Sequence, residues 1–142
     1  MFIKQRNALK STGCLSFRIG LYGLYSIRQL ILYDVFNELK SGHKEIYYQN
    51  AIAVGLRRSN INFKEQVYSP ITFKDELVGK YFFDFLIEDK IILEIKAGDK
   101  FSRKNIEQTY SYLRASDLNL GILANFTGSG VKFKRILNII SN

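Results

Sequence analysis

The sequence predicts an α/β domain in which helices flank a mixed β-sheet, in the order ααβββαβ followed by one further strand or helix. Apolar residues recur at helical spacing in three segments, 25–40, 44–58 and 102–116. Residues that favour pleated strands dominate four others, 64–73, 80–87, 91–97 and 118–126. A strand, a helix and a strand follow one another from residue 91 onward, which implies a right-handed crossover between two parallel strands.

The three expected helices carry recognisable end signals. The first is expected to end at Ser41-Gly42, because glycine readily adopts the conformation that follows a helix. The second closes on Arg57 and Arg58, whose positive charge suits the negative end of the helix dipole. Ser102 is the expected N-cap of the third helix.

The expected strands are separated by short polar turns. Lys74-Asp-Glu joins the first strand to the second, with Gly79 close to the start of the second. Glu88-Asp89-Lys90 joins the second to the third, and Thr127-Gly-Ser-Gly130 follows the fourth. The last segment, 131–137, is predicted as either a strand or a helix.

The N-terminal region is apolar but broken by charge. Arg18 and Arg28 interrupt the stretch 15–32, and no small-residue cleavage site follows it. We therefore expect neither a membrane-spanning helix nor a signal peptide. Residues 1–24 are treated as an N-terminal extension, and 25–142 as one domain.

Composition excludes several classes of site. The single cysteine, Cys14, excludes an internal disulfide and a multi-cysteine zinc site, and it suits a reducing cytoplasm. The single histidine, His43, lies in a polar loop, which argues against Ser-His-Asp catalysis. Oxygen ligands remain, so Mg²⁺ or Mn²⁺ is the metal that the sequence favours.

Charged residues interrupt the apolar hairpin of residues 81–96. If residues 88–90 form its turn, Asp84 lies directly opposite Glu94, and Lys96 points to the same face as Glu94. The remaining residues make both faces apolar: Phe82, Leu86 and Ile92 beside the charges, and Phe83, Phe85, Ile91, Leu93 and Ile95 on the other face. Buried carboxylates must be paired or bound to metal, so the pattern predicts a divalent-metal site with a lysine beside it; a solvated Glu–Lys pair at a strand end is the alternative.

The net charge of +8 is unevenly distributed. Residues 1–40 and residues 99–142 each carry +4, whereas residues 41–98, which contain the hairpin, are neutral. Basic flanks around a cluster of carboxylates suit a polyanion such as nucleic acid, although a generically basic protein has the same composition.

The chain resembles a known group of nucleases over residues 28–137. The order of elements, with Asp84 and Glu94-Ile95-Lys96 on a hairpin before a crossover helix, is similar to the PD-(D/E)xK superfamily and its restriction-endonuclease-like core. Phe83 replaces the proline of that name. The resemblance narrows to the Gly-x-x-Glu-x-x-Tyr family through four further motifs: Gly42-His-Lys-Glu45-Ile-Tyr-Tyr48, Gln108, Tyr112-Leu113 and Leu123-Ala-Asn-Phe126.

This resemblance implies a role for each matching residue. Asp84, Glu94 and the carbonyl of Ile95 would hold the metal, and Glu45 would complete its shell directly or through water. Lys96 would orient the attacking water and offset phosphate charge. Gln108 would contact the scissile phosphate, with a solvated helix residue as the alternative, and Tyr48 is expected to be structural.

The implied function is a Mg²⁺- or Mn²⁺-dependent nuclease acting on DNA in the cytoplasm. The alternative is a non-catalytic nucleic-acid-binding or scaffold protein on a nuclease fold. A protein partner or a homodimer stays open, with residues 1–24 as a possible docking arm. Basic residues outside the hairpin are expected to contact backbone phosphates: Lys100, Arg103, Lys104, Arg114, Lys132, Lys134 and Arg135.

Overall fold

The computed structural model describes residues 27–139, which form a five-stranded sheet covered by helices. The helical elements are η1 (Ile27–Leu32, a π-helix), α2 (Tyr33–Leu39), α3 (Glu45–Arg58) and α4 (Arg103–Ala115). The strands are β1 (Phe63–Phe73), β2 (Glu76–Ile87), β3 (Ile91–Ala97), β4 (Leu120–Thr127) and β5 (Gly130–Leu137). None of the helices in this range is long and apolar enough to cross a membrane.

The predicted α/β fold with a mixed β-sheet is confirmed. Its strand order is β1-β2-β3-β4-β5, and only the β3–β4 pair is parallel. Helix α4 provides the predicted crossover between those two strands, and Ser102 caps it by accepting a hydrogen bond from the backbone N–H of Asn105. The last segment, left open between strand and helix, is a strand that pairs with β4.

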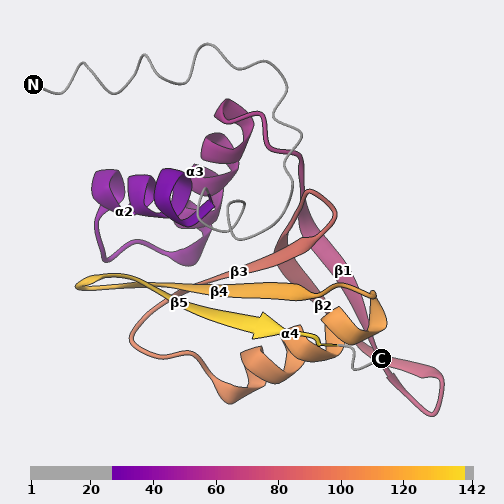
Figure 1. Cartoon of the computed structure of the whole chain (residues 1–142). Helices are drawn as coiled ribbons and strands as arrows, with labels where there is room; N and C mark the ends of the chain where they lie inside the picture. The colour runs from indigo at the N-terminus through magenta and orange to yellow at the C-terminus, as the bar shows by residue number, and fades with distance from the viewer. Residues whose placement is uncertain (1–26, 140–142) are drawn as a thin grey trace, which may run out of the picture.

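The helices cover opposite faces of the sheet (Figure 1). Helices α2 and α3 pack on one face over the larger apolar core, which includes Ile52, Leu56, Leu93 and Ile95. Helix α4 packs on the other face over a smaller core that includes Ile92, Leu113, Leu123 and Ile136. Burial on both faces explains why β3 reads as a nearly continuous apolar run.

Strand β2 begins earlier than the sequence suggests. The prediction placed its start at Lys80, with Gly79 near the turn, but β2 begins at Glu76. Lys74 and Asp75, both with positive φ, form a two-residue turn, which suits the twist of a hairpin. Gly79 lies inside the strand opposite Ile71, so it does not terminate the pairing.

A kink crosses both β1 and β2 at Gln66 and Asp84. Pairing runs up to Glu65↔Phe85 and resumes at Val67↔Phe83, without a pair between Gln66 and Asp84. Gln66 has φ 51°, a left-handed conformation that is unusual for a non-glycine residue in a strand.

The kink exchanges the two faces of the hairpin. Before it, Phe63 and Phe85 pack against the α3-side core; beyond it, Val67 and Phe83 pack against the α4-side core. The prediction that Phe83 shares a face with Phe85 is therefore wrong, because strict alternation does not survive a left-handed residue in the partner strand.

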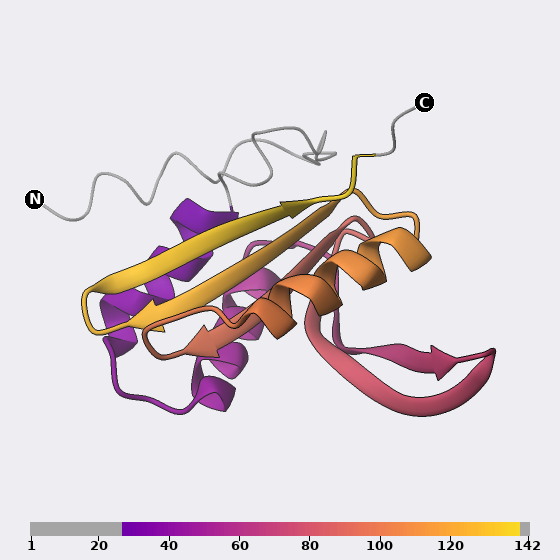
Figure 2. The same cartoon turned by 90° about the horizontal axis from the view of Figure 1, so that it is seen from below.

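Beyond the kink, β1 and β2 form a two-stranded arm that curves away from the rest of the sheet (Figure 2). The arm exposes several large apolar side chains: Tyr68, Ile71, Phe73, Leu77, Val78 and Phe82.

Candidate functional site

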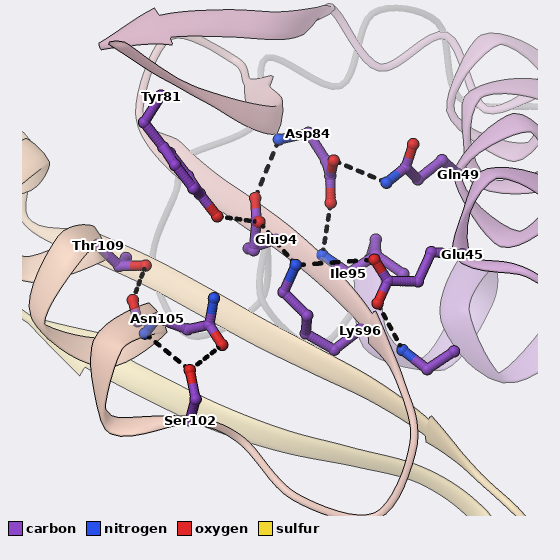
Figure 3. A network of polar contacts seen from close by, with 11 residues as sticks. Glu45, Gln49, Tyr81, Asp84, Glu94, Ile95, Lys96, Ser102, Asn105 and Thr109 are labelled. Atoms are coloured by element: carbon purple, nitrogen blue, oxygen red, sulfur yellow. Dashed lines mark hydrogen bonds and ion pairs between the residues drawn. The ribbon is translucent and has the colours of Figure 1, made fainter. Parts of the chain in front are cut away.

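The candidate site lies where the pairing of β2 with β3 ends. The last backbone pair is Phe85↔Leu93, so Asp84 and Glu94 occupy the next register position, as the turn had predicted. Beyond that pair, hydrogen bonds to their carboxylates join the two strands (Figure 3). The backbone N–H of Asp84 donates to Glu94 Oε2 at 3.1 Å, and that of Ile95 donates to Asp84 Oδ2 at 2.7 Å.

Both carboxylates are removed from water. Asp84 is 7% exposed and Glu94 is 3% exposed. Burial, followed by the nearby charge of Glu94, raises the pKa of Asp84 from 3.8 to about 7. A second negative charge at this position is therefore costly without a cation.

Lys96 and Glu45 join this pair from two different elements. The Lys96 ammonium lies 3.3 Å from Glu94 Oε1 and 3.7 Å from Glu45 Oε1. Glu45, the first residue of α3, also accepts a hydrogen bond from the backbone N–H of Ala97 at 3.1 Å. Burial alone would lower the pKa of Lys96, but the two carboxylates outweigh burial and raise it. Lys96 is therefore a cation held between acids.

Two residues that the sequence analysis missed complete the hydrogen bonding of the carboxylates. Gln49 Nε2 donates to Asp84 Oδ1 at 2.7 Å, and the Tyr81 hydroxyl donates to Glu94 Oε1 at 2.6 Å. Burial and the bond to Glu94 raise the pKa of Tyr81, so it stays a donor. Gln49 was detectable, because it lies one helical turn after Glu45 on the same side of α3.

Tyr81 was not detectable from alternation. It lies three residues before Asp84 in β2, and regular alternation would direct these two side chains to opposite faces. The kink turns Tyr81 to the α4 side of the sheet, where its hydroxyl reaches Glu94, whereas Asp84 reaches Glu94 through its backbone N–H.

The first turn of α4 borders the site through Asn105 rather than Gln108. The Asn105 amide accepts a hydrogen bond from the Ser102 hydroxyl, and its Nδ2 end points toward Lys96 and Tyr81 (Figure 3). Asn105 also acts on the Tyr81 hydroxyl, whose pKa it lowers against the larger effects of burial and Glu94. Gln108 is half-buried one turn further along, and none of the hydrogen bonds and ion pairs that join the site residues within residues 27–139 involves its side chain.

Tyr48 holds the loop that precedes Glu45 in place through ring stacking and hydrogen bonds. Its ring is 1% exposed and stacks on Phe126 with a centroid distance of 4.1 Å. Its hydroxyl donates to the carbonyl of Lys40 at 2.7 Å and accepts from the backbone N–H of His43 at 3.3 Å. Tyr48 thus has the structural placement that was predicted, and His43 is exposed in the loop.

The seven predicted phosphate contacts do not form one surface. Arg103 is exposed but pairs with Glu107 at 2.7 Å, and Arg114 lies over the Tyr110 ring at the far end of α4. Lys100 and Lys104 are exposed near the start of α4.

The three basic residues of β5 lie on two faces of the sheet. Lys132 and Lys134 pair with Asn125 and Leu123, which places them on the α4 face. Arg135 pairs with Ile122 of the α3-side core and so lies on the opposite face.

The residues of the site have the donor chemistry that a hard divalent cation requires. Each oxygen of Asp84 and Glu94 accepts one hydrogen bond, and a carboxylate oxygen has a second lone pair for a metal; at Glu94 Oε1 the Lys96 ammonium, 3.3 Å away, competes for it. The Ile95 carbonyl leaves β3 on the same edge as its N–H, toward Asp84 and beyond the β2–β3 pairs. Among residues 27–139, no three acidic, His or Cys side chains converge into a complete cage, and Lys96 separates Glu45 from the pair. Two carboxylates and a carbonyl would suit Mg²⁺, which retains several waters.

A family model matches the chain, whereas its similarity to individual proteins is low. No curated protein matches the chain. Among solved structures, the one described as the crystal structure of SSO0001 is similar at 16% identity, over 86% of this chain and 80% of that chain, with a TM-score of 0.46. The family model described as the PD-(D/E)XK nuclease superfamily matches residues 24–136, so the chain belongs to that superfamily.

Proposed function

We propose that the protein is a Mg²⁺-dependent nuclease that hydrolyses phosphodiester bonds in DNA. The observation that carries this proposal is the buried pair of Asp84 and Glu94 with the Lys96 ammonium beside it, in a chain of the nuclease superfamily. Mn²⁺ would substitute for Mg²⁺, because both accept oxygen ligands.

Each residue of the site has a proposed task. Asp84, Glu94 and the Ile95 carbonyl would hold the metal, with Glu45 as a further ligand directly or through water. A bound divalent ion would lower the pKa of a water and stabilise the leaving oxygen. Lys96 would orient that water and neutralise charge on the phosphate, for which its raised pKa keeps it protonated.

Further tasks belong to residues around the metal ligands. Gln49 and Tyr81 would keep the carboxylates in place through the hydrogen bonds described above. Asn105, rather than Gln108, is the polar residue of α4 best placed to reach the scissile phosphate, because its Nδ2 end points toward Lys96.

The finer assignment is to the Gly-x-x-Glu-x-x-Tyr family. It is supported by the positions of Glu45, at the site, and Tyr48, which anchors the preceding loop. We place the domain at residues 25–142, the extension at 1–24 and the protein in the cytoplasm, with a protein partner or a second copy as an additional binding partner.

A specific observation favours a second candidate, a nucleic-acid-binding protein without catalysis. Lys96 already supplies a positive charge between Glu94 and Glu45, which gives the acids an internal counter-ion. A protein that never binds metal would need such a counter-ion.

One assay separates the two candidates. The purified protein is incubated with single- and double-stranded DNA and RNA in Mg²⁺, in Mn²⁺ and in EDTA, next to Lys96→Ala. Metal-dependent cleavage that Lys96→Ala loses, while it still binds DNA, supports the nuclease. Binding by both proteins without cleavage under any of these conditions supports the second candidate.

A further inference from the structure

Asn125 of β4 is a buried amide without a partner. Its side chain is 1% exposed, and neither Oδ1 nor Nδ2 makes a hydrogen bond. Among the side chains that the structure describes, at residue 27 and residues 30–139, these are the only buried N or O atoms without a hydrogen bond. A buried unpaired amide lowers stability, so its presence calls for a functional explanation.

The sheet places Asn125 next to Lys96. The two residues are register partners in the parallel β3–β4 pair, so their backbones are about 4.8 Å apart. Ala124 and Phe126 belong to the α3-side core, and Leu123 belongs to the α4-side core. Asn125 therefore lies on the α4 face, between Lys96 and Lys132 of β5.

The present partners of Lys96 are the residues that the metal needs. Its ammonium lies 3.3 Å from Glu94 and 3.7 Å from Glu45, both longer than a good charged hydrogen bond. A divalent ion on these carboxylates would compete for their oxygens and repel the ammonium. Lys96, whose side chain is 26% exposed, would then need another acceptor, because a charge that is largely removed from water is costly without one.

We propose that Asn125 is a positioning residue whose Oδ1 accepts the Lys96 ammonium, directly or through one water, when Glu94 and Glu45 hold the metal. This inference rests on the proposed function. In this view the Asn125 amide has its hydrogen-bond partner only when metal is bound, because Lys96 must then face the phosphate and the attacking water.

A purely structural asparagine behaves differently, and the chain contains one. Asn138 is 7% exposed, and its Nδ2 donates to the carbonyls of Leu118 at 3.2 Å and Leu113 at 3.5 Å. Replacing Asn138 with leucine removes both of these hydrogen bonds, although the Leu113 carbonyl still accepts the backbone N–H of Leu118 at 2.9 Å. Replacing Asn125 instead removes an amide that is already unpaired.

The first test compares Asn125→Leu with Asn138→Leu in metal-free buffer, by thermal unfolding. Asn125→Leu should melt at or above the wild-type temperature, by up to about 3 °C, and Asn138→Leu should melt below it. An equal loss in both variants would mean that Asn125 is structural and would overturn the inference.

The second test titrates Mg²⁺ and follows the melting temperature, so it does not depend on cleavage. Without an acceptor for the displaced ammonium, Asn125→Leu should need about 10-fold more Mg²⁺ for the same rise. In a Lys96→Met background the same substitution should have no effect, because the ammonium is absent. Superimposed curves for wild type and Asn125→Leu would overturn the inference while leaving the nuclease proposal intact.

Cleavage provides the last comparison. Asn125→Leu should lower kcat at least about 10-fold with an unchanged KM, and Asn125→Asp, which keeps an acceptor, should recover most of that loss. A wild-type kcat in Asn125→Leu would contradict the inference. A wild-type protein whose melting temperature ignores both Mg²⁺ and Mn²⁺ would remove the inference and the proposed function together.

Discussion

Asp84 combines two properties that oppose each other in a folded protein. It is buried beside Glu94, and yet the proposed chemistry requires its charged form. Without metal, burial and the charge of Glu94 favour the protonated carboxyl group, which raises its pKa to about 7. Protonation, metal binding and stability are therefore linked at this one residue.

This linkage predicts how stability depends on pH in metal-free buffer. The folded pKa of Asp84 is about 7 and the ordinary value is 3.8, so the folded state retains a proton that the unfolded state has released. The retained proton stabilises the folded state fully below the ordinary pKa of 3.8, and this contribution is lost as the pH rises through about 7. Between these values the free energy of unfolding should fall by at most about 1.4 kcal/mol per pH unit. Denaturant unfolding of wild type and Asp84→Asn should show the extra slope only in wild type; parallel pH profiles would contradict it.

Glu94→Gln should separate repulsion from metal binding. The substitution removes one of two opposed negative charges, so the metal-free protein should be no less stable than wild type. It also removes a proposed ligand, so millimolar Mg²⁺ should no longer raise the melting temperature. Lys96→Ala serves as the control, since it should keep the Mg²⁺ response. An unchanged response in Glu94→Gln would exclude Glu94 as a ligand.

At the scale of single elements, the kink in β1 and β2 is the feature that makes the site. Gln66 holds a positive φ opposite Asp84, and the resulting change of face lets the Tyr81 hydroxyl reach Glu94, which also accepts the backbone N–H of Asp84. Strained backbone of this kind costs of order 1 kcal/mol or more and persists where the surrounding structure enforces it.

Valine and glycine at Gln66 should therefore have the opposite order of stability from the one they have in a regular strand. In a regular strand valine is more favourable than glycine by about 1 kcal/mol. At Gln66, where φ is 51°, glycine should be more stable than valine by about 1–2 kcal/mol. The same two substitutions at Glu65, the preceding residue, provide the regular-strand control in urea unfolding. A preference for valine at both positions would argue against the kink.

Helix α4 touches β4 through a pair of small residues. A Cβ added to Gly121 would lie 2.5 Å from Thr109 Cγ2, which is too close for real contacts, and Thr109 is fully buried. Gly121→Ala should lower the free energy of unfolding by about 1–3 kcal/mol. Thr109→Ser removes that methyl group but keeps the hydroxyl that bonds Asn105, so the double variant should be more stable than the sum of the single losses predicts.

The elements differ in how far the sequence could predict them. The register of Asp84 with Glu94 was predictable because the turn at residues 88–90 sets it locally. The exchange of faces at Phe83 was not, because a left-handed Gln66 in the neighbouring strand causes it and glutamine has no strong preference for that conformation. For the same reason Tyr81 escaped detection. Asn105, and not Gln108, borders the site because the orientation of α4 depends on its packing against Gly121, which the sequence pattern does not give.

The distribution of positive charge over the molecule should determine how the proposed DNA substrate is held. Lys132 and Lys134 lie on the α4 face with Lys96, and Arg135 lies on the other face. Lys132→Glu with Lys134→Glu should weaken DNA binding at low salt and reduce the slope of log K against log salt by about 1 for each lysine. Arg135→Glu is the matched control and should have a much smaller effect; equal effects would mean that both faces contact DNA. Binding is measured in EDTA to prevent cleavage.

The strand order of the sheet has a consequence for how the molecule folds. Strands are arranged in the order in which they occur in the chain, and only the β3–β4 pair requires a long connection, through α4. Asp84 and Glu94 are ten residues apart in one hairpin, so their charges meet when that hairpin closes, a step that takes about 1–10 μs in isolated hairpins. Their repulsion then opposes an early step of folding, and a divalent cation would relieve it. Mg²⁺ should therefore accelerate refolding as well as slow unfolding, so the metal ligands would influence the rate at which the fold itself appears.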